Sequence, residues 1–264
     1  MSNKGLLFEW CIYYLIKQSL PNSRTDTLMT TAKSNYNSAP KEIKVAAKNA
    51  IDVVRKTYGE IKSVEKLSGG DEPKTDLILK TSKNKTLKCS LKYGDSIQLS
   101  SGGVARTVSF LNGVLKNLAR ESGYDATAIK NILSALMNFE RQYGEIGSLP
   151  RNKIDKLMTE AERYDILLKN ILGTRRKPSV SGEYAKIKLA IVEEALTGKY
   201  TFRNSDKTAD HVLTEKYIRK IDSGFIKEVA DKTSVRLALK GRGKTMVGGK
   251  EVRLNEIVVR FDYN

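Results

Sequence analysis

The fold is decided by a short central stretch, 75–79 (TDLIL) followed by 86–93 (TLKCSLKY). Both segments are short, apolar and compatible with strands, and the polar run TSKNK at 81–85 between them is typical of a turn. We therefore expect an antiparallel strand pair. Alternation along its second strand places Ser90 and Lys92 on one side and Cys89 and Leu91 on the other.

The segments before this pair are predicted to be helical. Residues 5–20 carry apolar side chains at helical spacing and stop at Pro21, and Pro40 is placed to open a second helix. The second helix would bury a stripe of four residues, Ile43, Ala47, Ile51 and Val54. The intervening stretch 22–40 is rich in Ser, Thr and Asn, and we expect it to be a loop.

The remainder of the chain indicates a mixed fold. Helical spacing recurs over 104–120, 126–143, 152–172 and 182–196, and strand candidates follow at 209–213, 234–239 and 256–261. We predict an α/β (α+β) fold with a helical middle region and a C-terminal part that contains strands. The expected division is 1–172, a core with the helical region, and 173–264, a basic part that contacts DNA and that could pack into the same domain.

The net charge indicates a polyanionic partner. The 264 residues include 47 Lys and Arg against 30 Asp and Glu, which gives a formal charge of +17. Such an excess is most often found in proteins that bind nucleic acid and less often in those that bind an anionic membrane surface. The 40% content of hydrophobic residues is that of a globular protein, and wholesale disorder is not expected.

Scarce histidine and cysteine exclude several chemistries. One His and two Cys cannot supply the four ligands of a structural zinc site. A Ser-His-Asp or Cys-His enzyme would depend entirely on His211, which is flanked by Val212 and Leu213 and is more typical of a structural residue. An enzyme that acts on nucleic acid with this composition would hold its metal through carboxylates, which suits Mg²⁺.

The sequence predicts a cytoplasmic protein, in the host cytoplasm if the source is viral. Cys11 and Cys89 form no paired framework, which is typical of a reducing compartment. The apolar run 6–16 is too short for a membrane span of about 20 residues. It also contains Glu9 and lacks a cleavage site, so we expect neither a signal peptide nor a membrane partner.

The strand pair also carries the candidate chemistry. Phosphodiester hydrolysis with magnesium needs a carboxylate that fixes the metal, a water of lowered pKa and a cation near the phosphate. Asp76 at the head of one strand and Lys92 near the end of its partner could face one cleft, and the carbonyl oxygen of Leu91 could be a further metal ligand.

This arrangement resembles the PD-(D/E)xK nuclease superfamily, over about the first hundred residues. Pro73 and Asp76 match the proline and the first acid with two residues between them, and the Ser90-Leu91-Lys92 segment supplies the lysine. Glu9 matches a helical Glu of the family and Gln98 a glutamine that some branches place near the metal. The resemblance implies a restriction-endonuclease-like mixed central sheet flanked by helices. It also implies a restriction-type or phage-type DNA endonuclease that uses Mg²⁺ or Mn²⁺ and that can act as a homodimer.

One position departs from the family's pattern. Ser90 stands where the family has its second acid, and a neutral hydroxyl is a weak magnesium ligand. Either another carboxylate replaces it, with Glu9 and Glu65 as candidates, or the site is inactive. The alternatives are a non-catalytic DNA- or RNA-binding protein with a nuclease-like core, or a basic structural protein associated with nucleic acid.

Three basic clusters are candidates for contact with phosphates, most simply those of double-stranded DNA. No helix-turn-helix, RNP or zinc-finger signature indicates a known reading module. The candidates are Lys74, Lys83, Lys85 and Lys88 on the strand pair, Arg175, Arg176 and Lys177 in the 173–182 stretch, and Lys240, Arg242 and Lys244 in a glycine-rich segment.

Overall fold

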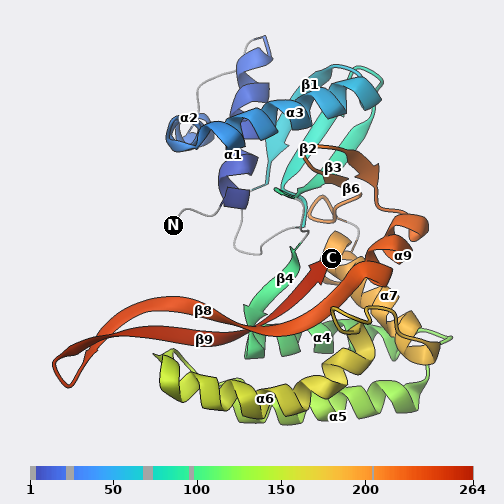
Figure 1. The fold of residues 1–264 in the computed structure, drawn as a ribbon. Coiled ribbons are helices and arrows are strands. Elements are labelled where there is room, and N and C mark those ends of the chain that lie inside the picture. The colour runs from blue at the N-terminus through green and yellow to red at the C-terminus, as the bar shows by residue number, and fades with distance from the viewer. Residues whose placement is uncertain (1–3, 22–26, 68–73, 95–97, 204, 264) are drawn as a thin grey trace. The chain divides into compact units, whose positions relative to one another are not determined.

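A computed structural model describes residues 4–21, 27–67, 74–94, 98–203 and 205–263, apart from the side chains of 98–102, 162–167 and 263. The protein is mixed α/β, as predicted. It forms two compact units, each built from two stretches of the chain: Met1–Ile97 with Leu196–Phe225, and Gln98–Ala195 with Ile226–Asn264 (Figure 1). The expected division at residue 173 followed chain order, whereas the units interleave.

The first unit contains a five-stranded mixed sheet in the order β1-β2-β3-β6-β7. Its strands are β1 Ile61–Lys66, β2 Leu77–Thr81, β3 Thr86–Leu91, β6 His211–Leu213 and β7 Ile218–Lys220. The expected antiparallel pair is confirmed as β2 and β3, with Leu77 opposite Cys89. Strand β6 joins β3 in parallel, so a segment more than a hundred residues later completes this sheet.

The helices of the first unit are α1 Lys4–Ser19, α2 Thr27–Ser38, α3 Lys41–Tyr58 and the short α8 Lys199–Phe202. The first helix and the helix after Pro40 were expected, and all four stripe residues of α3 are buried. The expectation of a loop over 22–40 is wrong for 27–38. Only Ala32 of α2 is buried, so this helix has almost no apolar stripe, and its contact with α1 includes the rings of Tyr14 and Tyr36, whose centroids are 4.8 Å apart.

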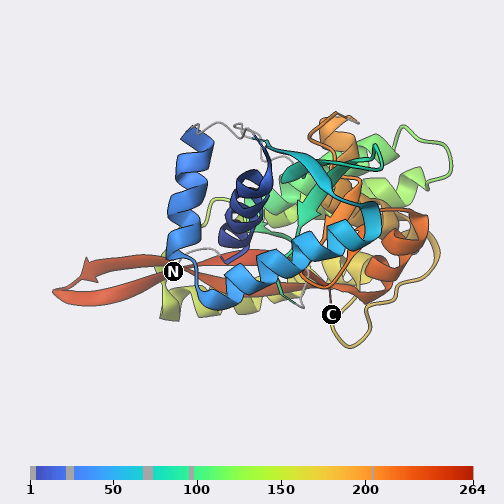
Figure 2. The same ribbon diagram turned by 90° about the horizontal axis from the view of Figure 1, so that it is seen from above.

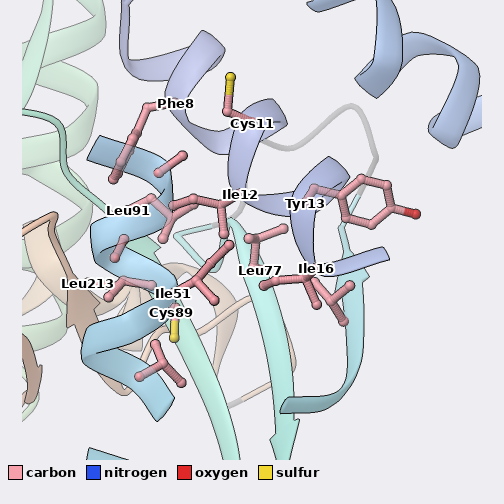
Figure 3. Packing of buried hydrophobic residues seen from close by; sticks show 14 of the residues in the cluster. Phe8, Cys11, Ile12, Tyr13, Ile16, Ile51, Leu77, Cys89, Leu91 and Leu213 are labelled. Atoms are coloured by element: carbon pink, nitrogen blue, oxygen red, sulfur yellow. The ribbon is translucent and has the colours of Figure 1, made fainter. Parts of the chain in front are cut away.

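The core of this unit lies between the sheet and the helices α1 and α3. Leu77, Cys89 and Leu91 point toward Phe8 and Ile12 of α1 and toward Ile51 of α3 (Figure 3). Each fully buried large aliphatic side chain in such a core contributes about 1.5–3 kcal/mol. Since Cys89 and Leu91 face this core, alternation directs Lys88, Ser90 and Lys92 to the opposite side of β3.

The second unit combines helices with an antiparallel sheet. Its helices are α4 Val104–Leu118, α5 Ala126–Tyr143, α6 Arg151–Leu172 and α7 Gly182–Thr197, all close to their predicted bounds, and α9 Ser223–Lys232 leads into its last two strands. Its strands are β4 Gln98–Gly103, β5 Leu149–Pro150, β8 Thr233–Val247 and β9 Lys250–Tyr263. Strand β9 pairs with β4, β5 and β8.

Strands β8 and β9 form a hairpin much longer than the predicted strands 234–239 and 256–261. Their pairing runs without interruption from Thr233–Tyr263 to Val247–Lys250, apart from one irregularity between Gly241 and Gly243. Gly248 and Gly249 close it with φ of +57° and +77°, the backbone that a two-residue hairpin turn requires and that glycine adopts without strain. In Figures 1 and 2 this ribbon runs out beyond the helices of its own unit.

Among the described residues, no helix is long and apolar enough to cross a membrane.

Candidate active site at the end of the β2–β3 pair

Asp76 is held in place by the backbone of the neighbouring strand. It lies one residue before β2, where its N–H donates to the carbonyl oxygen of Cys89 at 2.9 Å. Its Oδ2 accepts a hydrogen bond from the N–H of Leu91 at 2.6 Å. These two bonds fix the carboxylate at the end of the β2–β3 pair and leave its other oxygen without a hydrogen bond to the described residues.

Glu9 reaches the same end of the sheet from α1. Its Oε2 forms an ion pair with Nζ of Lys66 at 2.9 Å, and both side chains are largely buried, 19% and 10% exposed. The Lys66 ammonium also lies 4.9 Å from the ring centroid of Trp10. The ring of Phe8 contacts that of Tyr93, with centroids 5.5 Å apart, so this turn of α1 lies beside the end of β3.

Electrostatics connects these groups. The pKa of Asp76 is raised to about 7, chiefly by burial and then by the nearby Glu9 carboxylate, against the opposing effects of Lys92, the Leu91 N–H and Lys66. A carboxylate responds in this way when it is desolvated beside a like charge. Glu9, Lys92 and Lys66 are therefore near enough to Asp76 to shift its pKa, and we call these four residues the Asp76 cluster.

Lys92 extends from the end of β3 on the side that Ser90 also faces. Its backbone N–H donates to the carbonyl oxygen of Leu213 at 2.9 Å, which ties this end of β3 to β6. Ser90 is 2% exposed, so its hydroxyl lies in the interior rather than on the surface. The N–H of Leu91 is committed to Asp76, and the metal-ligand role expected of Leu91 concerns its carbonyl oxygen alone.

The carboxylate oxygens of Glu9 and Asp76 are of the type that Mg²⁺ prefers as ligands. The described residues contain no group of three or more His, Cys, Asp or Glu side chains arranged to hold a metal ion. Mg²⁺, however, is commonly bound through one or two carboxylates with waters in its other positions, and Glu9 and Asp76 provide two. Glu65, the other carboxylate considered, is exposed on β1 and is not among the charges that shift the pKa of Asp76.

Lys66 is the member of the cluster that the sequence analysis missed. It belongs to β1, a strand that was not predicted, and it pairs in register with Leu77. A strand register cannot be read from the sequence, so no local pattern marks this lysine as a neighbour of Glu9.

For two residues of the family resemblance, the described part of the structure gives no side-chain position. Pro73 lies outside the described residues. Gln98 opens β4 of the second unit, where its backbone pairs with Asp262, and its side chain is also outside the described part. The expected catalytic role of Gln98 therefore stays a prediction.

The basic side chains of the strand pair fall into two groups. Lys83 and Lys85 are exposed at the turn, whereas Lys74 and Lys88 are half-buried, and Nζ of Lys88 donates to the carbonyl oxygen of Ser205 at 3.2 Å. Near the turn, a cavity of about 310 Å³ is lined by cationic, hydroxyl and amide side chains: Lys62, Ser63, Lys80, Thr81, Asn84, Lys85 and Thr86. The Oγ1 of Thr81 is buried there without a hydrogen-bond partner.

The remaining basic candidates lie in the second unit. Arg175, Arg176 and Lys177 are exposed in the connection between α6 and α7. The three from the glycine-rich segment are exposed on β8, where Arg242 forms an ion pair with Glu256 at 2.6 Å and Lys244 forms one with Glu251.

His211 has a structural environment, as expected. It is 6% exposed on β6, its Nδ1 lies 2.5 Å from Oδ1 of Asp210, and its Nε2 lies 3.1 Å from the hydroxyl of Tyr58. Asp210 also accepts a hydrogen bond from the N–H of Lys88 at 2.8 Å. The imidazole thus links α3 to the β3–β6 pair.

Comparison with known protein families, with characterised proteins and with solved structures found no match to this chain.

Proposed function

We propose that the protein is a magnesium-dependent endonuclease with a PD-(D/E)xK-type site, acting on double-stranded DNA. The observation that carries the proposal is the cluster at the end of the β2–β3 pair, in which Asp76 is clamped by backbone bonds beside Glu9 and Lys92. The mixed sheet flanked by α1 and α3 is consistent with a restriction-endonuclease-like core.

Each residue of the cluster has a role in this proposal. Asp76 and Glu9 would hold Mg²⁺, with the carbonyl oxygen of Leu91 as an additional ligand, and Mn²⁺ would suit the same oxygens. The bound ion supplies a water of lowered pKa and neutralises charge on the phosphate. The ammonium of Lys92 would stabilise the negative charge that develops on the phosphate oxygens.

The test is cleavage of supercoiled and linear DNA in Mg²⁺ and in Mn²⁺. Asp76→Asn and Lys92→Met should each lower the rate about 100-fold or more, because they remove a metal ligand and a charge-stabilising cation. Lys56→Met, a substitution of an exposed lysine on α3, should leave the rate unchanged and serves as the control. Wild-type protein that binds DNA but cleaves none in either metal would overturn the proposal.

The second candidate is a non-catalytic DNA- or RNA-binding protein with a nuclease-like core. Two observations favour it: Ser90 supplies no second acid, and the ammonium of Lys66 already neutralises Glu9. Binding without cleavage would support this candidate. A third, a basic protein that coats nucleic acid, would show affinity that falls steeply with salt and no preference for any sequence.

The quaternary state and compartment are part of the same proposal. A homodimer would present two sites to the two strands of a duplex, and light scattering of the purified protein tests this. Cys11 and Cys89 are free and buried, consistent with a reducing cytoplasm.

A further inference from the structure

The outer half of the β8–β9 hairpin contributes no side chain to the buried core of its unit. Every residue from Lys240 to Glu251 is exposed, and we call residues 240–253 the arm. Its β8 side, from Lys240 to Val247, spans about 24 Å at about 3.4 Å per residue. A long exposed hairpin exposes backbone groups and side chains that could pair with other chains, and such edges are usually short or protected. An arm of this length therefore needs a partner.

The charge of the arm selects the partner. It carries five cations, Lys240, Arg242, Lys244, Lys250 and Arg253, against the single carboxylate of Glu251. Within the described part of the chain, Lys240, Lys250 and Arg253 have no carboxylate partner. A second copy of this chain would bring a second set of five cations against the first, so self-association through the arm is opposed by like-charge repulsion. Duplex DNA presents the complementary charge on both sides of a groove.

The tip of the arm is apolar. Met246 and Val247 are the last side chains of β8 before the two glycines, and they are 64% and 52% exposed. An apolar tip on a basic ribbon is the combination by which architectural proteins enter the minor groove and wedge a side chain between base steps.

The dimensions of the arm set a condition on this mode. The backbones of two paired strands lie about 4.8 Å apart, so with its side chains the ribbon is wider than a minor groove of about 6 Å. Gly241 and Gly243 keep β8 thin, and Gly248 and Gly249 do the same at the turn. The ribbon needs a widened groove, and a wedge at its tip widens it by partly unstacking a base step.

We propose that the arm enters the minor groove of duplex DNA and that Met246 and Val247 act as a wedge that kinks the duplex. The inference rests on the DNA-binding part of the proposed function, but it does not require cleavage. On this basis the arm holds and bends the substrate, independently of the Asp76 cluster.

The experiment measures the bend by energy transfer between dyes at the two ends of a duplex of about 30 base pairs, with Ca²⁺ or EDTA in place of Mg²⁺. Wild-type protein should shorten the end-to-end distance. Met246→Ser with Val247→Ser should abolish the change while the Kd rises less than about threefold, because the cations remain. Lys244→Gln with Arg253→Gln should instead raise the Kd about tenfold and lower the salt slope by about 2.

Met137→Ser is the matched control. Met137 is 63% exposed on α5, so its substitution removes an equally exposed methionine of the same unit outside the arm. A minor-groove ligand such as netropsin should compete with wild-type bending. An unchanged bend in the tip variant would overturn the proposal, as would tip-dependent dimerisation or binding to anionic vesicles without a bend in DNA.

The same assay separates this proposal from the nuclease. Asp76→Asn should bend DNA as the wild type does. If the protein bends DNA but cleaves none in Mg²⁺ or Mn²⁺, the proposal for the arm is supported and the nuclease proposal is rejected. If it cleaves DNA but its bending does not depend on the tip, the nuclease proposal is supported and the proposal for the arm is rejected.

Discussion

At the scale of single residues, Asp76 is expected to lower the stability of the fold at neutral pH. Its pKa is raised from 3.8 to about 7, chiefly by burial and then by Glu9, so the folded chain binds a proton more tightly than the unfolded chain. The free energy of unfolding should therefore fall as pH rises from about 4 to about 7.

Asp76→Asn tests this loss of stability, because the amide oxygen can still accept a hydrogen bond from the Leu91 N–H but the side chain carries no charge. We expect the variant to be about 1–2 kcal/mol more stable than the wild type at pH 8, after allowance for partial exposure, and to lose that advantage near pH 4. Urea unfolding in EDTA measures both values. A variant that is less stable by the same amount at both pH values would show that Asp76 contributes through its hydrogen bond alone.

Lys66 and Mg²⁺ are expected to compete for Glu9. Lys66→Met removes the ammonium 2.9 Å from Oε2 of Glu9 and leaves a mostly buried carboxylate unpaired, which should cost about 1–3 kcal/mol in EDTA. Under the nuclease proposal, Mg²⁺ should restore much of this stability and should bind the variant more tightly than the wild type. Thermal unfolding over a Mg²⁺ titration tests this, with Lys56→Met as control, and equal Mg²⁺ responses of the two variants would contradict it.

At the scale of elements, the helices and strands that could be predicted from the sequence are those whose buried side chains recur at regular spacing. α3 and the β2–β3 pair follow the helical and alternating patterns, and Asp76 and Lys92 could be located because they lie next to those strands. β1 was missed because a register shift between Ile61 and Ser63 spoils its alternation. α2 and β4 were missed because Thr, Ser, Asn and Gly are poor guides to structure that depends on packing against α1 or pairing with β9.

The lysines of β1 and β2 indicate a path for a bound DNA strand. Lys80 lies four residues along β2 from Asp76, about 13 Å away, so the cavity that it lines with Lys62 and Lys85 could hold a phosphate beyond the scissile one. Lys62→Gln with Lys80→Gln should weaken DNA binding about tenfold at moderate salt and lower the salt slope by about 2. Fluorescence anisotropy over a KCl series measures this. Loss of cleavage at saturating DNA would argue against a purely binding role, and Lys56→Gln is the control.

At the scale of the whole molecule, the chain order and the folded units do not coincide. Strands β6 and β7 complete the sheet of the first unit, and β8 and β9 complete that of the second. The basic C-terminal part is therefore not a separate tail, because each unit contains strands from the last third of the chain. A hydrophobic pattern identifies such strands but does not identify the sheet that they join.

Lys188 of α7 links the two stretches of the second unit. It is 3% exposed, and its ammonium donates to the carbonyl oxygens of Pro178 and, at 2.8 Å, of Thr233 at the start of β8. Burial lowers its pKa from 10.5 to about 8. The unfolded chain then binds the proton more tightly than the folded chain, so the free energy of unfolding should rise as pH increases from about 8 to about 10.5.

Lys188→Met isolates this contribution from other groups that titrate in the same range. The wild type should gain about 1–3 kcal/mol relative to the variant between pH 8 and pH 10, measured by urea unfolding. Below pH 8 the wild type retains the two hydrogen bonds at the cost of a buried charge, so the difference between the proteins should be constant there. A difference that stays constant up to pH 10 would mean that Lys188 remains protonated, and that its two carbonyl partners compensate fully for its burial.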